Sequence, residues 1–359
     1  MTQTSRFPVL DGWRAIAIGL VIWHHATTGF YANEDLYYQT SKSQLGAFGV
    51  DIFFGLSGLL ISALLLREYR QKGAISLVGF YTRRIFRILP PCFAFLLVAG
   101  RLGLIQSPLE LASCLAFFRN YLPVSLGGYY TGHLWSLAVE EHFYLFWPAL
   151  LVWLTTRDLS GRAVAYISIF FGLWRVYDAQ TGATARLLPG VNTHFRSDLR
   201  ADALLWGCYI AFLLATPGAT ERLRKHLNAP VVAIATAAAL ACVLFYSMLA
   251  MLWFAMLVPM ILAGTMLHPE WRFCRVLESS LIRFVGRISY SLYIWQELFL
   301  TPGWMPKLGV LQQQPWNLIA TFAVATASYY LIEKPCMQFG RLAAQRAGRV
   351  LKPRFATIF

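Results

Sequence analysis

The chain has 359 residues, of which 57% are hydrophobic, 15% are aromatic and only 13% are charged. Soluble domains are normally less apolar, so the composition predicts an all-α, polytopic membrane protein. The net charge of +14 would suggest nucleic acid as the partner of a soluble protein, but no nucleic-acid-binding motif accompanies it. The six cysteines show no CxxC spacing, so we expect neither a metal site nor a disulfide framework.

Ten apolar segments are long enough to be transmembrane helices. In chain order they are 13–30, 47–66, 88–105, 134–154, 163–180, 199–216, 229–246, 249–267, 283–301 and 316–333. Most Lys and Arg residues fall in the segments on one side, and by the positive-inside rule this predicts that both termini are cytoplasmic. We expect residues 1–335 to form the membrane domain. Residues 336–359 would form a basic cytoplasmic tail that lies against anionic headgroups.

Ionisable residues interrupt the first apolar segment, LDGWRAIAIGLVIWHHA. Such groups are costly inside a bilayer and often mark a functional site. Arg14 and His25 are eleven residues apart, so on an α-helix they share one face and are separated by about 16.5 Å of rise. With Arg14 at the cytoplasmic edge, His25 would lie near the bilayer midplane. Asp11, three residues before Arg14, is expected to pair with it rather than to bind a ligand.

Further ionisable residues occur in four other blocks. Asp51 lies in GVDIFFGLSGLLIS, Arg83, Arg84 and Arg87 in FYTRRIFRILPP, Glu140 and Glu141 in HLWSLAVEEHFYLFWP, and Arg200 and Asp202 in RSDLRADALLWG. A carboxylate beside a histidine fixes the tautomer of its ring, as a general base requires. The arginine cluster, which precedes a proline that can begin a helix, matches the phosphate groups of an anionic ligand. The carboxylates alternatively suit ion or proton transport.

Seven stretches together resemble the acyltransferase family 3 of integral membrane O-acyltransferases. These stretches, in family order, are LDGWRAIAIGLVIWHH, GVDIFFGLSGLLIS, FYTRRIFRILPP, HLWSLAVEEHFYLFWP, RADALLWG, FVGRISYSLYIWQ and LIEKP. The resemblance implies transfer of an acyl group, in most cases acetyl, from cytoplasmic acyl-CoA to a hydroxyl of a glycan or lipid-linked acceptor on the outer side. It also implies that the protein lies in the bacterial inner membrane, with membrane lipids as partners. Acyl-CoA would be a co-substrate rather than a permanently bound cofactor.

The resemblance assigns roles to the residues already named. Arg14 and the cluster of Arg83, Arg84 and Arg87 would bind the nucleotide and phosphates of acyl-CoA. His25 would act as general base, with its ring oriented by Asp51, Glu140 or Glu141. Further candidates are Arg200, Asp202 and Gln296.

Gln296 departs from the family, which often has histidine after SYSLYIW. An amide cannot act as a base, so the proton chemistry falls to His25. Direct transfer and an acyl-histidine intermediate both remain open, with direct transfer favoured because one base suffices when both substrates are held in place.

Two further alternatives concern the whole protein. Some members of the family carry an extracytoplasmic hydrolase-like domain that is not present in this sequence, so we expect either a separate extracytoplasmic partner or a membrane domain that suffices alone. The alternative function is a transporter or flippase of acyl, sugar or lipid substrates, in which the same charges would line a path without covalent chemistry.

Overall fold

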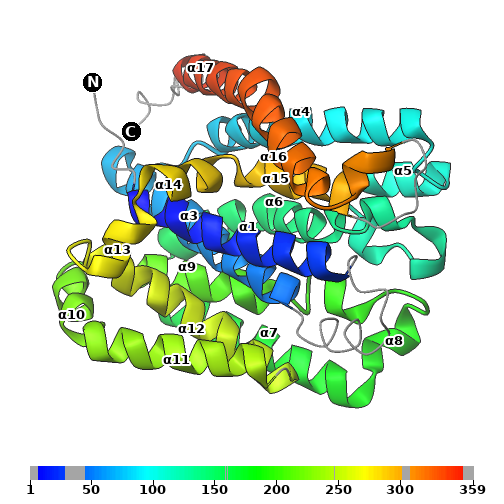
Figure 1. Ribbon diagram of the computed structural model, residues 1–359. Helices are drawn as coiled ribbons and strands as arrows, with labels where there is room; N and C mark the ends of the chain where they lie inside the picture. Colours follow the sequence, from blue (N-terminus) through cyan, green and yellow to red (C-terminus); the bar gives the residue numbers. More distant parts are fainter. Residues whose placement is uncertain are drawn as a thin grey trace.

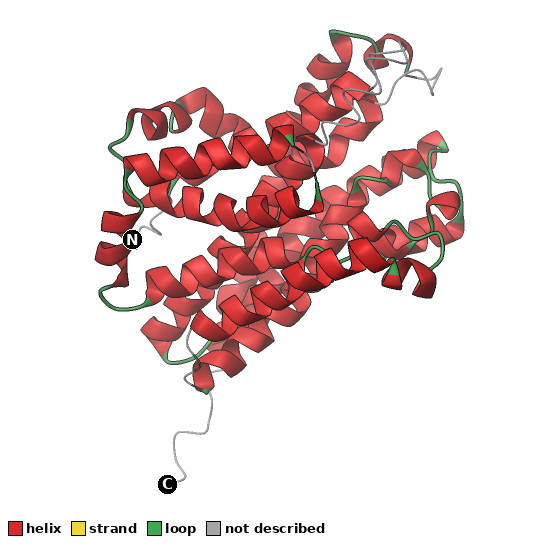
Figure 2. Ribbon diagram, turned by 90° about the horizontal axis from the view of Figure 1, so that it is seen from below, coloured by secondary structure: helices red, strands yellow, loops and turns green. Residues whose placement is uncertain are grey.

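The computed structural model describes residues 7–28, 45–157, 159, 161–245, 247–300 and 308–350. Within these ranges the regular structure is helical and contains no strand, as Figures 1 and 2 show. The prediction of an all-α chain is therefore confirmed for the part of the sequence that the structure describes. Most of the long helices run side by side across the view of Figure 1.

The elements follow one another without a second domain between them in the described ranges. The longer helices are α1 (Pro8–Thr28), α3 (Leu45–Lys72), α4 (Leu77–Leu102), α6 (Leu134–Thr156), α7 (Gly161–Thr181), α9 (Ala201–Ala215), α11 (Ala229–Leu244), α12 (Met248–Leu267), α15 (Ser289–Leu300), α16 (Trp316–Ser328) and α17 (Lys334–Val350). The shorter helices are α5 (Pro108–Leu115), α8 (Ala183–Leu187), α10 (Ala219–His226), α13 (Arg272–Leu277) and α14 (Ser280–Arg287). Single turns are η1 (Arg119–Tyr121), η2 (Val124–Leu126), η3 (Tyr129–Thr131), η4 (Thr193–Phe195) and η5 (Gly309–Gln312), and a π-helical turn, η6 (Tyr329–Glu333), joins α16 to α17.

Four of the described helical segments are long and apolar enough to cross a membrane. They are Leu45–Lys72, Leu77–Leu102, Tyr129–Thr156 and Met248–Leu267. A fifth results if α9 and α10, which are bent by 118° relative to each other, form one broken span. All ten predicted segments coincide with helices, but the number of ten is not confirmed, because several of these helices are short or contain charges. The cytoplasmic location of the termini and the domain boundary at residue 335 stay predictions.

Helix α4 begins earlier than the sequence predicts. Its first residue is Leu77, and the side chain of Ser76 caps it by accepting a hydrogen bond from the Gly79 N–H. Pro90 and Pro91 therefore lie inside the helix rather than at its start. The expectation that a proline begins this helix was wrong, because the serine cap already satisfies an unpaired amide of an earlier turn. The FYTRRIFR stretch consequently lies within the first turns of α4.

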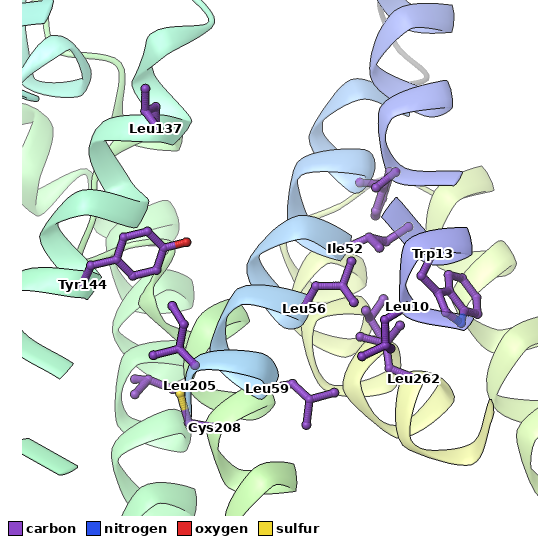
Figure 3. Close-up of a cluster of buried hydrophobic side chains, with 14 of the residues drawn as sticks. Leu10, Trp13, Ile52, Leu56, Leu59, Leu137, Tyr144, Leu205, Cys208 and Leu262 are labelled. Atoms are coloured by element: carbon purple, nitrogen blue, oxygen red, sulfur yellow. The ribbon is translucent and has the colours of Figure 1, made fainter. Parts of the chain in front are cut away.

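Helices α3 and α9 pack with their backbones in close contact. A Cβ atom placed on Gly58 would overlap the Leu204 carbonyl oxygen, and one placed on Gly207 would overlap the Gly55 carbonyl oxygen. Small residues allow such an approach between membrane helices. Apolar side chains then surround the contact, among them the labelled residues Leu56, Leu59, Leu205 and Cys208 in Figure 3.

We expect Gly58→Ala to destabilise the protein, because the new methyl group must push α3 away from α9. The expected loss is about 1–3 kcal/mol in the free energy of unfolding, as for other overpacked cores. The matched control is Gly19→Ala at an exposed site of α1, where a Cβ meets no atom within 4 Å; there the change should be neutral or stabilising by up to about 1 kcal/mol. Thermal unfolding in detergent measures both, and equal midpoints would contradict the packing argument.

Candidate active site

A cavity of about 390 Å³ lies between α1, α3, α4, α6, α14, α15 and the η6 turn with the start of α17. Four arginines line it: Arg14, Arg84, Arg87 and Arg287. Asp11 forms an ion pair with Arg14, with 3.1 Å between Oδ1 and Nη1, so this predicted pairing is confirmed. For the other three arginines no ion pair occurs among the residues that the structure describes. Unpaired guanidinium groups around a cavity suit a ligand with several phosphates.

The arginines reach the cavity from three helices. Arg84 and Arg87 are three residues apart on α4 and therefore share a face. Arg83 is exposed and does not line the cavity, so the structure does not bring it together with the other predicted arginines. A Cβ on Gly286 would overlap the Asp11 carbonyl oxygen, so α14 packs directly on α1. This contact brings Arg287 into the same cavity, and the sequence did not single out that residue.

A hydrogen-bonded group of three side chains lines the cavity between α3 and α6. The Ser57 hydroxyl donates to Oε1 of Glu140 at 2.7 Å, and the Tyr144 hydroxyl lies 3.0 Å from Oε2 of Glu140 and 3.1 Å from the Ser57 oxygen. The Arg84 guanidinium lies 4.5 Å from the centre of the Tyr144 ring, a cation–π contact. Two hydroxyl donors thus hold the Glu140 carboxylate in place.

Two further hydroxyl groups line the cavity from α6 and α15. Ser136 and Glu140 are four residues apart on one face of α6, so this helix presents a stripe of polar groups to the cavity. The oxygens of Ser136 and Tyr293 are 2.5 Å apart. The Tyr293 hydroxyl also donates to the carbonyl oxygen of His133 at 2.6 Å. These hydroxyl groups extend the polar lining of the cavity toward α15.

His25 contacts a carboxylate that the sequence analysis did not select. Nε2 of His25 lies 3.1 Å from Oε1 of Glu297, whose side chain is only 4% exposed. Glu297 is four residues after Tyr293 on α15, so it lies on the same helix face about 6 Å further along the axis. His25 itself is not among the residues that line the cavity. The pair therefore lies one helical turn beyond the Tyr293 hydroxyl.

The carboxylate that contacts His25 is Glu297, whereas the sequence analysis assigned the orientation of this ring to Asp51, Glu140 or Glu141. Glu140 is bound by Ser57 and Tyr144 as described above, and Asp51 is paired with Arg200 at 3.3 Å. Glu141 follows Glu140 on α6 and is therefore rotated by about 100° from it; it does not line the cavity. The sequence contained the information needed to select Glu297, because an acidic residue within an apolar segment is as costly to bury as the acidic residues that were selected.

The remaining predicted residues lie outside the arginine-lined cavity. Asp202 is buried and pairs with Arg175 of α7 at 2.8 Å; the sequence analysis had not chosen Arg175. Arg200 lies 5.3 Å from the centre of the Trp135 ring. Gln296 is fully buried next to Glu297. Among the described residues no group of three or more His, Cys, Asp or Glu side chains is arranged to hold a metal ion.

Comparison with known proteins gives one family. The family model described as "Acyltransferase domain" (Acyl_transf_3) matches residues 7–333. Peptidoglycan O-acetyltransferase OatA of Listeria monocytogenes is 27% identical over an alignment of 386 positions, which covers 95% of this chain and 58% of that protein. The putative O-acetyltransferase SACOL0978 of Staphylococcus aureus is 27% identical over an alignment of 370 positions, which covers 93% of this chain and 58% of that protein. O-acetyltransferase OatA of S. aureus is 26% identical over an alignment of 378 positions, which covers 95% of this chain and 58% of that protein.

The chain thus spans little more than half the length of these relatives, and no solved structure matches it. The family match nevertheless covers nearly all of the helical bundle, including the four cavity arginines, the Ser57 and Glu140 pair and the contact between His25 and Glu297. On this match the chain belongs to the acyltransferase family 3, a family of enzymes that transfer acyl groups.

Proposed function

We propose that this protein is a membrane O-acetyltransferase that uses cytoplasmic acetyl-CoA as acyl donor and a glycan or lipid-linked hydroxyl at the outer side as acceptor. The relatives are named O-acetyltransferases, which supports acetyl as the group transferred. The observation that carries the proposal is the cavity in which four arginines and several hydroxyl groups line one continuous space, together with the carboxylates of Asp11, Glu140 and Glu333. A polyphosphate nucleotide fits the first set of groups, and a thioester carbonyl fits the second.

The donor binds with its phosphates against the arginines. Arg14, Arg84, Arg87 and Arg287 are the groups that line the cavity and carry permanent positive charge. The pantetheine arm follows the cavity past Glu140, and the thioester carbonyl lies near the hydroxyl groups of Ser136 and Tyr293. The Ser136 hydroxyl, which can turn away from the Tyr293 oxygen, donates a hydrogen bond to the carbonyl oxygen as it gains negative charge, which lowers the barrier to attack. The Tyr293 hydroxyl stays bound to the His133 carbonyl oxygen.

His25 acts as the general base. Glu297 faces Nε2 and holds the proton of the ring on that nitrogen, so Nδ1 is the nitrogen that accepts a proton. The acceptor oxygen attacks the thioester carbon and forms the C–O bond while its proton passes to Nδ1. The tetrahedral intermediate then collapses, the C–S bond breaks, and the imidazolium of His25 gives its proton to the CoA sulfur. No further reactant is needed.

The decisive experiment uses purified protein in nanodiscs with acetyl-CoA that carries a radiolabel in the acetyl group. We expect release of free CoA that depends on His25, with the label appearing on an added glycan acceptor. Label that stays on denatured wild-type protein but is absent from His25→Ala would replace direct transfer with an acyl-histidine route. Absence of acetyl-CoA binding and turnover would refute the enzyme function and favour transport.

Substitutions at His25 and Glu297 separate the role of the general base from that of the carboxylate that contacts it. We expect His25→Ala to lower kcat by about 10²–10⁴-fold, the usual contribution of a general base. Glu297→Ala lowers kcat by a smaller factor, and Glu297→Gln, which keeps a hydrogen-bond acceptor, by less still. Because neither residue binds the phosphates, KM for acetyl-CoA stays unchanged.

The control for this series is His24→Ala. His24 is the neighbour of His25 but is rotated by about 100° on α1, and its ring centre lies 5.4 Å from that of His25. The His24 variant should retain most activity. Equal rates of CoA release from the His25 variant and the wild type would exclude His25 as the base.

The arginines provide a separate test of donor binding. We expect Arg87→Ala to weaken acetyl-CoA binding by about 10-fold to 100-fold, the loss of one charge-assisted hydrogen bond. Arg83→Ala is the matched control, because Arg83 lies on the same helix but is exposed and outside the cavity. Titration calorimetry measures both affinities. If both variants bound acetyl-CoA with the same affinity, the cavity would not be the binding site of the donor.

A further inference from the structure

A second cavity, of about 190 Å³, lies among the end of α7, α8, η4, the two residues before α9 and the first turn of α12. It is remote from the arginine-lined end of the first cavity. Arg200, which borders the second cavity, pairs with Asp51, whereas Leu64 of the same helix α3 lines the first. Asp51 and Leu64 are thirteen positions apart, which corresponds to about 20 Å of helix. In Figure 1, α8 lies at the lower right and α17 at the upper left.

Two buried arginines border this second cavity. Arg175 and Arg200 are each 2% exposed, and each uses one nitrogen in an ion pair, with Asp202 and Asp51 respectively. Nε and Nη1 of Arg175 and Nε of Arg200 have no hydrogen-bond partner in the described ranges. A buried donor without a partner costs about 1–3 kcal/mol. A polar ligand in the cavity that accepts hydrogen bonds would remove this cost.

The second cavity also offers hydrogen-bond acceptors. Asp178 borders it and is 3% exposed. Its Oδ1 accepts one hydrogen bond, from the Thr184 N–H at 2.7 Å, and a carboxylate has lone pairs for about three more. The Thr193 hydroxyl borders the cavity as well and can both donate and accept. The ligand must therefore donate hydrogen bonds in addition to accepting them.

The charges around the second cavity leave no excess of positive charge. The two guanidinium groups pair with Asp202 and Asp51, and Asp178 borders the same cavity. Burial, together with the nearby guanidinium groups of Arg200 and Arg175, lowers the pKa of His194 below its usual range, so this ring adds no positive charge at neutral pH. A free anion would gain little in such a surrounding. A neutral ligand rich in hydroxyl groups, each of which donates one hydrogen bond and accepts others, satisfies both sets of groups.

We propose that the second cavity is a saccharide subsite, which holds one sugar ring of the acceptor through its hydroxyl groups. Met248, Met251 and Leu199 border the same space and would face the C–H groups of the ring. This inference rests on the proposed function, which requires an acceptor at the end of the bundle remote from the donor phosphates. Arg200 lies between the two cavities. It borders the second cavity and pairs with Asp51, and the residue before Asp51, Val50, lines the first cavity.

The test uses the full chain in nanodiscs without acetyl-CoA, so that it is independent of the donor. Glucose and N-acetylglucosamine are the probes, and saturation-transfer difference NMR detects their contact with the protein. Ala179→Phe narrows the cavity, because Ala179 is an exposed residue at its border. Gln180→Phe is the matched control, since the next residue is also exposed but does not border the cavity. Arg175→Gln removes the charged donor.

We expect signals from at least one sugar with the wild type and with Gln180→Phe, and about a tenfold weaker affinity with Ala179→Phe and Arg175→Gln. Thermal unfolding should show the same midpoint for Ala179→Phe and Gln180→Phe. Equal sugar signals from these two variants, no signal from the wild type, or displacement of the sugar by sulfate would overturn the saccharide subsite. Sugar contact that depends on Ala179 in a protein that does not bind acetyl-CoA would retain the subsite and refute the donor proposal.

Discussion

The close approach of α3 to α9 is the constraint on which both cavities depend. Gly58 and Gly207 let the two backbones touch, and this contact fixes the rotation of both helices about their axes. With that rotation, α3 presents Ser57 to the arginine-lined cavity and Asp51 to Arg200 of α9. A side chain at either glycine would separate the helices and move the two groups away from their partners. Packing and chemistry are thus determined by the same pair of helices.

Buried charge is distributed differently at the two ends of the bundle. At one end Asp51 and Asp202 each face an arginine, so the cost of burying each charge is offset by its partner. At the other end Arg87 and Arg287 border a cavity and have no acidic partner in an ion pair within the described segments. A guanidinium group that forms no ion pair with the protein is available to a ligand. The first arrangement leaves little net charge for an ionic ligand, and the second favours binding of a polyanion.

The sequence predicted local features better than contacts between helices. Apolar runs identified the helices, and the spacing of Asp11 and Arg14 was enough to predict their ion pair, which lies within one helical turn. The partner of His25 could not be obtained in this way, because Glu297 is 272 positions away in the chain and only the packing of α15 against α1 brings the two together. Arg287 was missed for the same reason, since its place depends on the contact between α14 and α1. Helix periodicity constrains one helix, whereas a site requires several.

The arrangement of polar groups along α15 argues for transfer between opposite ends of the bundle. Ser289 and Tyr290 line the first cavity at the start of the helix, Tyr293 follows one turn later, and Glu297 faces His25 one turn beyond. A donor that enters from the arginines therefore reaches neutral hydroxyl groups before it reaches the ionisable pair. An acceptor that approached along the same path would have to pass the donor. Under the proposed function, approach from the end of the bundle near Arg200 would bring the attacking hydroxyl to the histidine first, so that the proton could leave as the new bond forms.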